Sequence, residues 1–229
     1  MHDEADGAAE AEARAEQERL RALVRTESAP WLRLDGAVAG ADVAYDDEAG
    51  VCAAAVVVLD GRTLDVLDRA VAVRPVEFPY VPGLLAFREA PPLLHALDGL
   101  GARPDVLVCD GYGVAHPRRV GLASHVGVLT GIPSLGVAKN PLTFAHEEPG
   151  EERGSWAPLT DGESGGEVVG RALRTRDGVK PLFVSAGHLV GLDDACALTL
   201  RLTPRYRQPE TTRLADRLCR DALKSGIPR

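Results

Sequence analysis

Two aspartates stand where an ionised side chain is unusual. Asp42 lies inside an apolar run, residues 36–45, and Asp110 ends another, the DVLVC stretch of residues 105–109. A carboxylate in apolar surroundings is costly unless a cation or hydrogen bonds compensate it. If the two runs are neighbouring strands, the carboxylates lie close together and a divalent cation would relieve their repulsion. Two carboxylates with phosphate oxygens are a usual set of magnesium ligands, so the pattern predicts metal-assisted chemistry on a phosphate.

Glu89 is a third acid for the same point, because it lies on the helix expected after a proline-rich loop. Two of the three acids have an ordinary alternative. Asp110 precedes Gly111 and also suits a turn, and Glu89 also suits a solvated helix face or an ion pair with Arg88. Asp42 has no such alternative, since an aspartate in the middle of a strand has no capping role.

The elements that must position these acids form a mixed α/β pattern. A helix over 8–26 precedes three strands with short turns, which is the spacing of an antiparallel meander. Alternating elements follow, with a helix break expected at the proline pair 91–92. In chain order we expect strands 36–45, 51–59 and 64–73, proline-rich loop 75–83, helix 84–100, strand 105–109, helix 119–130, strand 134–138, polar loop 145–166, strands 168–174 and 181–185, and helices 192–202 and 210–224. Several mixed sheets share this order, the ribonuclease-H-like one among them.

The chain has 229 residues, 45% of them hydrophobic and 26% charged, which suits one globular domain. We expect an acidic N-terminal helix over 1–26 and a single domain over 27–229. The net charge of −8 is uneven: residues 1–18 carry seven acidic and one basic residue, and residues 171–229 carry twelve basic and six acidic. A basic C-terminal part beside an acidic centre suits an enzyme that grips phosphates and holds cations, and equally a well-solvated surface.

The expected cellular compartment follows from three features that the sequence lacks: paired cysteines, a membrane-spanning run and a secretory signal. The four cysteines show no CxxC pairing and lie mostly in apolar stretches, so we expect buried thiols in a reducing, cytoplasmic compartment. No apolar run is long enough to span a membrane, and the acidic N-terminus is unlike a secretory signal.

Six ordered motifs resemble the endonuclease V family. They run from about residue 35 to about residue 220, and the DGYGVAHPRR stretch and the PYVPG…FRE spacing are quite specific. The motifs are GADVAY (40–45), FPYVPG with FRE (78–83 and 87–89), DGYGVAHPRR (110–119), GVAK (136–139), VSAGH (184–188) and RQPETTRLAD (207–216). Two positions depart from the family pattern, Ala186 for a frequent proline and Ala41 for a frequent valine. We expect them to affect loop stiffness and packing more than chemistry.

The resemblance implies a ribonuclease-H-like fold and magnesium-dependent DNA repair, with manganese as an alternative cation. Family members hydrolyse the second phosphodiester bond on the 3′ side of deoxyinosine and leave a 3′-hydroxyl and a 5′-phosphate. Asp42 and Asp110 would then bind the metal, and Glu89 would hold it directly or through water and orient the attacking water. Lys139 would steady the reacting phosphorus or the leaving oxygen, and His116 and His188 would contact phosphate or handle protons near the metal.

The segment Pro79-Tyr80-Val81-Pro82 has a physical logic of its own. Two prolines stiffen the loop and present Tyr80 and Val81 as a tip that can fill the gap left by a displaced base, since enzymes that read one altered base generally flip it out. A structural turn is the ordinary alternative. Glycines let a backbone approach a flat base closely, and the glycines expected in the lesion pocket are Gly83, Gly111, Gly113 and Gly121. The candidates for phosphate contact are Arg118, Arg119, Arg205, Arg207 and Arg213, although each alone fits an ordinary surface or salt-bridging arginine better.

Three other functions remain open at this point. The first is cleavage of RNA that contains inosine, which a requirement for a 2′-hydroxyl would distinguish from cleavage of DNA. A binding module that has lost catalysis is disfavoured by the presence of all three acids. A phosphatase for small substrates would leave the rigid tip and the basic C-terminal part unexplained. We expect a monomer that acts on DNA containing deaminated bases. We expect no membrane partner, because no apolar run is long enough to span a bilayer.

Overall fold

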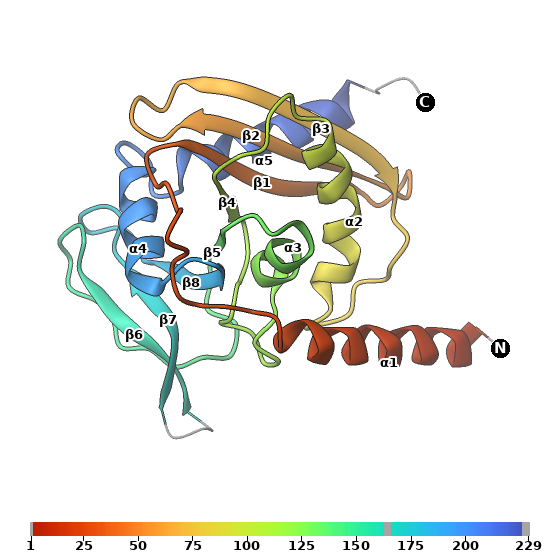
Figure 1. The fold of residues 1–229 in the computed structure, drawn as a ribbon. Coiled ribbons are helices and arrows are strands. Elements are labelled where there is room, and N and C mark those ends of the chain that lie inside the picture. Colours follow the sequence, from red (N-terminus) through yellow and green to blue (C-terminus); the bar gives the residue numbers. More distant parts are fainter. Residues whose placement is uncertain (1, 163–165, 226–229) are drawn as a thin grey trace.

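The computed structural model describes residues 2–162 and 166–225, with side chains from residue 7 onward (Figure 1). Residues 1, 163–165 and 226–229 lie outside the described residues. They belong to the expected helix 1–26, loop 145–166 and domain 27–229. The helices are α1 (His2–Arg21), α2 (Leu85–Asp98), α3 (Leu122–Thr130), α4 (Leu192–Arg201) and α5 (Glu210–Lys224). The strands are β1 (Ala37–Asp46), β2 (Val51–Asp60), β3 (Val66–Pro75), β4 (Val106–Cys109), β5 (Ser134–Ala138), β6 (Trp156–Asp161), β7 (Glu167–Leu173) and β8 (Leu182–His188).

The strands form one mixed sheet in the order β3-β2-β1-β4-β5-β8-β7-β6. The first three strands pair antiparallel, as the meander pattern predicts. β4 then joins β1 in parallel, and β5 joins β4 in parallel, while β8 runs antiparallel to β5. The expected mixed α/β sheet is therefore confirmed, with three parallel strands at its centre.

Helices cover both faces of the sheet (Figure 1). One core lies between the sheet and the pair α2 and α3, and includes Ala39, Val56 and Leu93. On the opposite face, α4 packs over the central strands and α5 packs over β1 and β2. Because side chains alternate along a strand, odd-numbered positions of β1 face α2 and even-numbered positions face α5.

Two predicted helices have different bounds in the structure. The N-terminal helix ends at Arg21 rather than at residue 26, because the segment after it runs beside the end of β8: the Leu189 amide donates to Arg25 O (2.7 Å) and the Ala29 amide to Leu189 O (3.0 Å). Helix α3 begins at Leu122 rather than at 119. Arg119 has φ of 59°, which is not helical.

Two further expectations were wrong. The proline pair Pro91-Pro92 does not break α2, which is continuous from Leu85 to Asp98. Burial of Ala90 and Leu93 against the sheet outweighs the hydrogen bonds that the prolines cannot make. The polar segment 145–166 is also not all loop. It contains edge strand β6, which pairs with β7 and thereby gains its backbone hydrogen bonds.

The four cysteines are free and buried, as expected. Within residues 2–162 and 166–225, no helix is both long enough and apolar enough to cross a membrane.

Candidate active site

The pairing of β1 with β4 brings Asp42 and Asp110 together. In this parallel pair Ala41 lies opposite Cys109, and the Asp110 amide donates to Ala41 O (3.1 Å). Each aspartate therefore follows directly on a paired position of adjacent central strands. Both occupy even-numbered positions, the parity of Val38 and Val108 in the core that lies on the α4 and α5 face. The sequence expectation that the two acids meet is borne out by the register.

A close approach of α5 adds a fourth acid that sequence reasoning had not singled out. Gly40 shares the face of Asp42, and a Cβ there would meet the backbone carbon of Thr211 at 2.3 Å. The absence of a side chain thus lets α5 lie against β1, and the charge of Asp216 on α5 acts on Asp42. Asp216 also pairs with Arg220 (2.8 Å), so in the sequence it resembles an ordinary acid of a solvated helix face.

Glu89 approaches Asp42 and Asp110 from α2, which packs on the other face of the sheet. It is only 9% exposed, and Tyr45 donates a hydrogen bond from its hydroxyl to Glu89 Oε1 (3.2 Å). Burial, and next the charge of Asp42, raise the pKa of Glu89 to about 8 although the hydrogen bond from Tyr45 opposes the shift. Glu89 is therefore an acid held at the site and not a solvated one.

Lys139 follows β5 and forms an ion pair with Asp110. Burial lowers the pKa of Lys139, but the hydrogen bond and charge of Asp110, with the charges of Asp42 and Asp216, raise it on balance. The charge of Asp42 is less well offset than that of Asp110. Its Oδ1 accepts a hydrogen bond from the Val43 amide (2.9 Å), yet burial and the charge of Asp110 raise the pKa of Asp42 to about 7. The centre holds more negative charge than its one lysine offsets.

This donor set fits a hard divalent cation. Carboxylate oxygens are the protein ligands that magnesium prefers, and magnesium commonly takes one or two carboxylates and fills its other positions with water and phosphate oxygens. Asp42 and Asp110 supply that pair, and Glu89 lies close enough to feel the charge of both. Among the described residues, no three histidine, cysteine, aspartate or glutamate side chains already converge as ligands, so a bound cation would rely on two carboxylates rather than on a closed protein cage.

The raised pKa values predict how metal-free protein responds to pH. Well below pH 4 both Asp42 and Glu89 are protonated in the folded and unfolded states, and their ionisation does not affect stability. As pH rises to about 8, the unfolded chain ionises first and the folded protein must then ionise against burial and repulsion. These two groups should therefore make the protein less stable between pH 4 and pH 8, which urea unfolding in EDTA across that range measures.

Magnesium should reverse this loss at pH 8, because a ligand that binds only the folded state stabilises it. An Asp42→Asn variant in EDTA should lose less stability than wild type over the same pH range. Parallel pH profiles for wild type and variant would contradict the charge repulsion assigned to Asp42.

His116 and His188 each have defined partners within the protein. His116 Nε2 lies 3.0 Å from Gly83 O, and its Nδ1 accepts a hydrogen bond from the Arg118 amide (3.2 Å). His188 pairs with Ser134 at the start of β5, whereas Lys139 follows the end of that strand. At about 3.3 Å per residue the length of β5 separates His188 from Lys139. The structure thus does not bring His188 to the carboxylates, and it places His116 against the proline-rich loop.

The proline-rich loop presents its tip to solvent, since Tyr80 is 68% exposed. The pocket glycines differ in their surroundings. Gly83 and Gly111 have positive φ values of 78° and 147°. A Cβ on Gly113 would meet Ala186 O at 1.9 Å, and one on Gly121 would meet Tyr112 O at 2.4 Å. Gly113 and Gly121 therefore allow close approach of this chain's own backbone. Gly111 has more free space around it, since a Cβ there would meet its nearest neighbour, Leu122, at 3.9 Å.

Four of the five arginines named as candidates for phosphate contact are engaged within the protein. Arg118 donates to Gly83 O, and Arg119 pairs with Asp161 (2.7 Å) and Glu167 (2.6 Å). Arg207 donates to the carbonyls of Lys139, Lys180 and Pro181, and thereby fixes the segment that carries Lys139. Arg213 pairs with Glu210 and lies over the ring of Tyr206. Arg205 is exposed.

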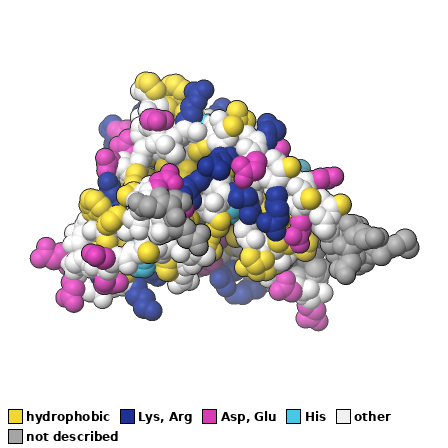
Figure 2. Space-filling view, turned by 90° about the horizontal axis from the view of Figure 1, so that it is seen from below, with side chains coloured by type: hydrophobic (Ala, Val, Ile, Leu, Met, Phe, Trp, Pro, Cys, Tyr) yellow, Lys and Arg dark blue, Asp and Glu magenta, His cyan; other side chains and the backbone are white. Residues whose placement is uncertain are grey.

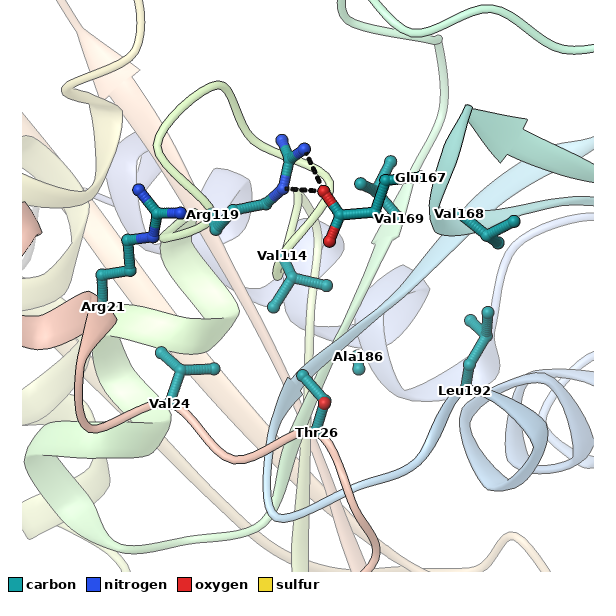
Figure 3. A pocket seen from close by; sticks show the side chains of 10 residues that line it. All are labelled: Arg21, Val24, Thr26, Val114, Arg119, Glu167, Val168, Val169, Ala186 and Leu192. Carbon is teal, nitrogen blue, oxygen red and sulfur yellow. Dashed lines mark hydrogen bonds and ion pairs between the residues drawn. The ribbon is translucent and has the colours of Figure 1, made fainter. Parts of the chain in front are cut away.

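Two hollows differ in their relation to the acids. The pocket in Figure 3 lies between the end of α1, β7, β8 and α4, and its one acid, Glu167, is paired with Arg119. None of the four site acids lines it. A second hollow is lined by Tyr45, Asp47, Tyr80, Leu85 and Arg88. It joins the exposed tip of the proline-rich loop to Tyr45, the partner of Glu89, and is the better placed for a substrate.

Charge on the α1 side of the molecule is not uniform. Figure 2 shows this side, with a group of basic side chains near the middle and several acidic ones toward the edges. The net charge of −8 therefore does not exclude an anionic partner.

Comparison with known proteins agrees with the motifs. A model of the family Endonuclease V matches residues 18–217. The endonuclease V of Streptomyces avermitilis is 63% identical over 219 residues, which are 96% of this chain and 94% of that relative. A crystal structure of endonuclease V from the same organism has a TM-score of 0.89 at 62% identity and covers 96% of this chain and 95% of its own. Endonuclease V of Ciona intestinalis, in complex with DNA containing an inosine followed by a ribo-adenosine, has a TM-score of 0.83 at 28% identity and covers 95% of this chain and 99% of its own. These likenesses confirm the expected ribonuclease-H-like α/β fold.

Proposed function

The chain belongs to the endonuclease V family and is a nuclease, hence a phosphodiester hydrolase, and from that premise we propose that it repairs DNA by cutting beside deoxyinosine. The bond cut is the second phosphodiester bond on the 3′ side of the lesion, and the products carry a 3′-hydroxyl and a 5′-phosphate. The reaction depends on magnesium, for which manganese can substitute.

The observation that carries this proposal is the meeting of Asp42, in the middle of β1, with Asp110, directly after the neighbouring parallel strand β4, under an excess of negative charge. A divalent cation at this point would lower the pKa of water and stabilise charge on phosphoryl oxygens. Asp42 and Asp110 would hold that cation. Glu89 is buried beside them and has a raised pKa. It would orient the attacking water and take up its proton.

Lys139 and Asp216 complete the centre. The Lys139 ammonium, held by Asp110 and by the Arg207-anchored backbone, steadies the leaving oxygen. Asp216 faces Asp42 from α5 and adds a carboxylate on the side opposite Glu89. Its place supports a role in holding the cation through water.

The exposed tip at Tyr80 and Val81 supports recognition of a single displaced base. Flipping a base out of a duplex costs a few kcal/mol, less for a poorly paired lesion, and a rigid tip that fills the gap offsets part of that cost. The hollow between Tyr80 and Tyr45 leads toward Glu89. The complex of the Ciona relative with inosine-containing DNA is in line with this class of substrate.

The test uses a 5′-labelled duplex with one deoxyinosine, beside an identical duplex with adenine, in magnesium and in EDTA. We expect one nick, one nucleotide beyond the lesion, in the inosine strand only and in magnesium only. An inosine-containing RNA of the same sequence is the second substrate. Cleavage of the RNA alone would show that RNA is the substrate in place of DNA. Cleavage of neither nucleic acid would refute the proposal.

A further inference from the structure

One fully buried polar side chain on α1 has no place in the site described so far. The inward face of α1 carries Ala13, Gln17 and Leu20, which recur at helical spacing and are all buried. Gln17 has no exposed surface. A buried amide without partners is destabilising, so the side chain must be held by specific contacts.

Those contacts join α1 to both loops expected to handle the lesion. Gln17 Nε2 donates to Gly83 O (3.0 Å) and to Val120 O (3.2 Å), and Gln17 Oε1 accepts from Arg118 Nε. Gly83 ends the proline-rich loop, and the other two residues belong to the segment that follows Asp110. One side chain thus bridges three parts of the chain that are far apart in sequence.

Gly83 is held from several sides. Its carbonyl oxygen accepts from Gln17 Nε2 (3.0 Å), from His116 Nε2 (3.0 Å) and from Arg118 Nη2 (2.7 Å). His116 Nδ1 accepts from the Arg118 amide, so the neutral ring carries its proton on Nε2 and donates it. Burial lowers the pKa of His116 to about 4 and keeps the ring in this neutral form.

The other end of the loop is anchored by aromatic packing. The ring of Phe78 lies 5.8 Å from that of Phe87, which meets His125 edge-on at 5.0 Å. Between these anchors the Tyr80 tip stays exposed. The loop is therefore fixed at both ends and free only where it would enter a duplex.

We propose that Gln17 is a positioning residue that sets the Tyr80 tip for opening a duplex at the lesion, so that α1 is part of the recognition machinery. This role of Gln17 rests on the proposed function, to which it adds the contact that positions the tip. A tip that fills the space of a flipped base matters when the base must leave a stack and a partner strand. It matters far less for inosine in a single strand, where no partner strand has to be opened.

The test compares Gln17→Met with wild type on two substrates of the same sequence, duplex and single-stranded deoxyinosine DNA. Methionine has a similar size and shape and cannot make the amide hydrogen bonds. We expect kcat/KM on the duplex to fall by about tenfold, because the three hydrogen bonds that hold the loop end through Gln17 are lost, with a change of less than about twofold on the single strand. Arg19→Gln, which removes only an exposed ion pair of α1 with Glu16, is the matched control and should leave both substrates unaffected.

Equal losses on the two substrates, or no loss on either, would overturn the proposal. Hydrogen exchange of the Leu84 amide, which donates to Val81 O within the loop, gives a readout independent of activity. It should quicken in Gln17→Met while amides of β1 and β4 keep their protection, and unchanged exchange would also overturn the proposal. Wild type that cuts neither substrate would instead refute the proposed function and leave the exchange result to decide the role of Gln17.

Discussion

Replacing Asp42 with asparagine is expected to reduce cleavage of an inosine-containing duplex by about 10³-fold or more. The substitution keeps the shape of the side chain and removes one of the two carboxylates that we propose as ligands of the cation. A catalytic cation contributes several kcal/mol of transition-state stabilisation, and each 1.36 kcal/mol corresponds to a tenfold change in rate. Single-turnover rates with saturating enzyme in magnesium measure the effect.

The same variant should not be less stable than wild type. Burial and the charge of Asp110 raise the pKa of Asp42 to about 7, so the ionised carboxylate destabilises the folded metal-free protein at pH 8. Its removal should raise the melting temperature in EDTA, by about 2–4 °C for each kcal/mol relieved in a chain of this size. Asp98→Asn, at the exposed end of α2, is the matched control and should change neither property. An unstable Asp42→Asn variant would contradict the electrostatic account of the site.

Replacing Lys139 with methionine is expected to lower the single-turnover rate by about 10²–10³-fold, the usual effect of removing one preorganised group that stabilises transition-state charge. The loss has two sources. In the proposed mechanism the leaving oxygen loses the Lys139 ammonium that would stabilise it, and Asp110 loses the ion pair that offsets its charge. Metal-free protein at pH 8 should therefore also become less stable, opposite to the effect of Asp42→Asn.

Lys224→Met is the control for this second variant, because Lys224 is an exposed lysine at the end of α5. It should keep wild-type rate and stability. A Lys139→Met protein that cuts at the wild-type rate would show that its ammonium acts only on folding.

The sequence indicated the acids because they break a local rule. Asp42 interrupts an apolar strand, and that conflict is readable without a structure. What placed it beside Asp110 was the parallel pairing of β1 and β4, whose residues are 68 positions apart in the chain. Such long-range pairing depends on packing of the whole sheet and has no local signal, so the meeting of the two acids was only an expectation until the register was known.

Residues that act through other residues were harder to find. Gln17 sits in a helix rich in polar residues, where only its spacing from Ala13 and Leu20 marks it as inward. Asp216 has the appearance of a surface acid paired with an arginine one turn away. The sequence also gave no sign that Arg207, a candidate for phosphate contact, donates hydrogen bonds to three backbone carbonyls.

The position of the cation tests the account most directly. Crystals of the protein with an inosine-containing duplex and manganese would be measured by anomalous scattering at the manganese edge. We expect a peak within ligand distance of both Asp42 and Asp110, with the cut phosphate on its open side. A peak bound elsewhere, or a bound duplex with no peak between these two carboxylates, would contradict it.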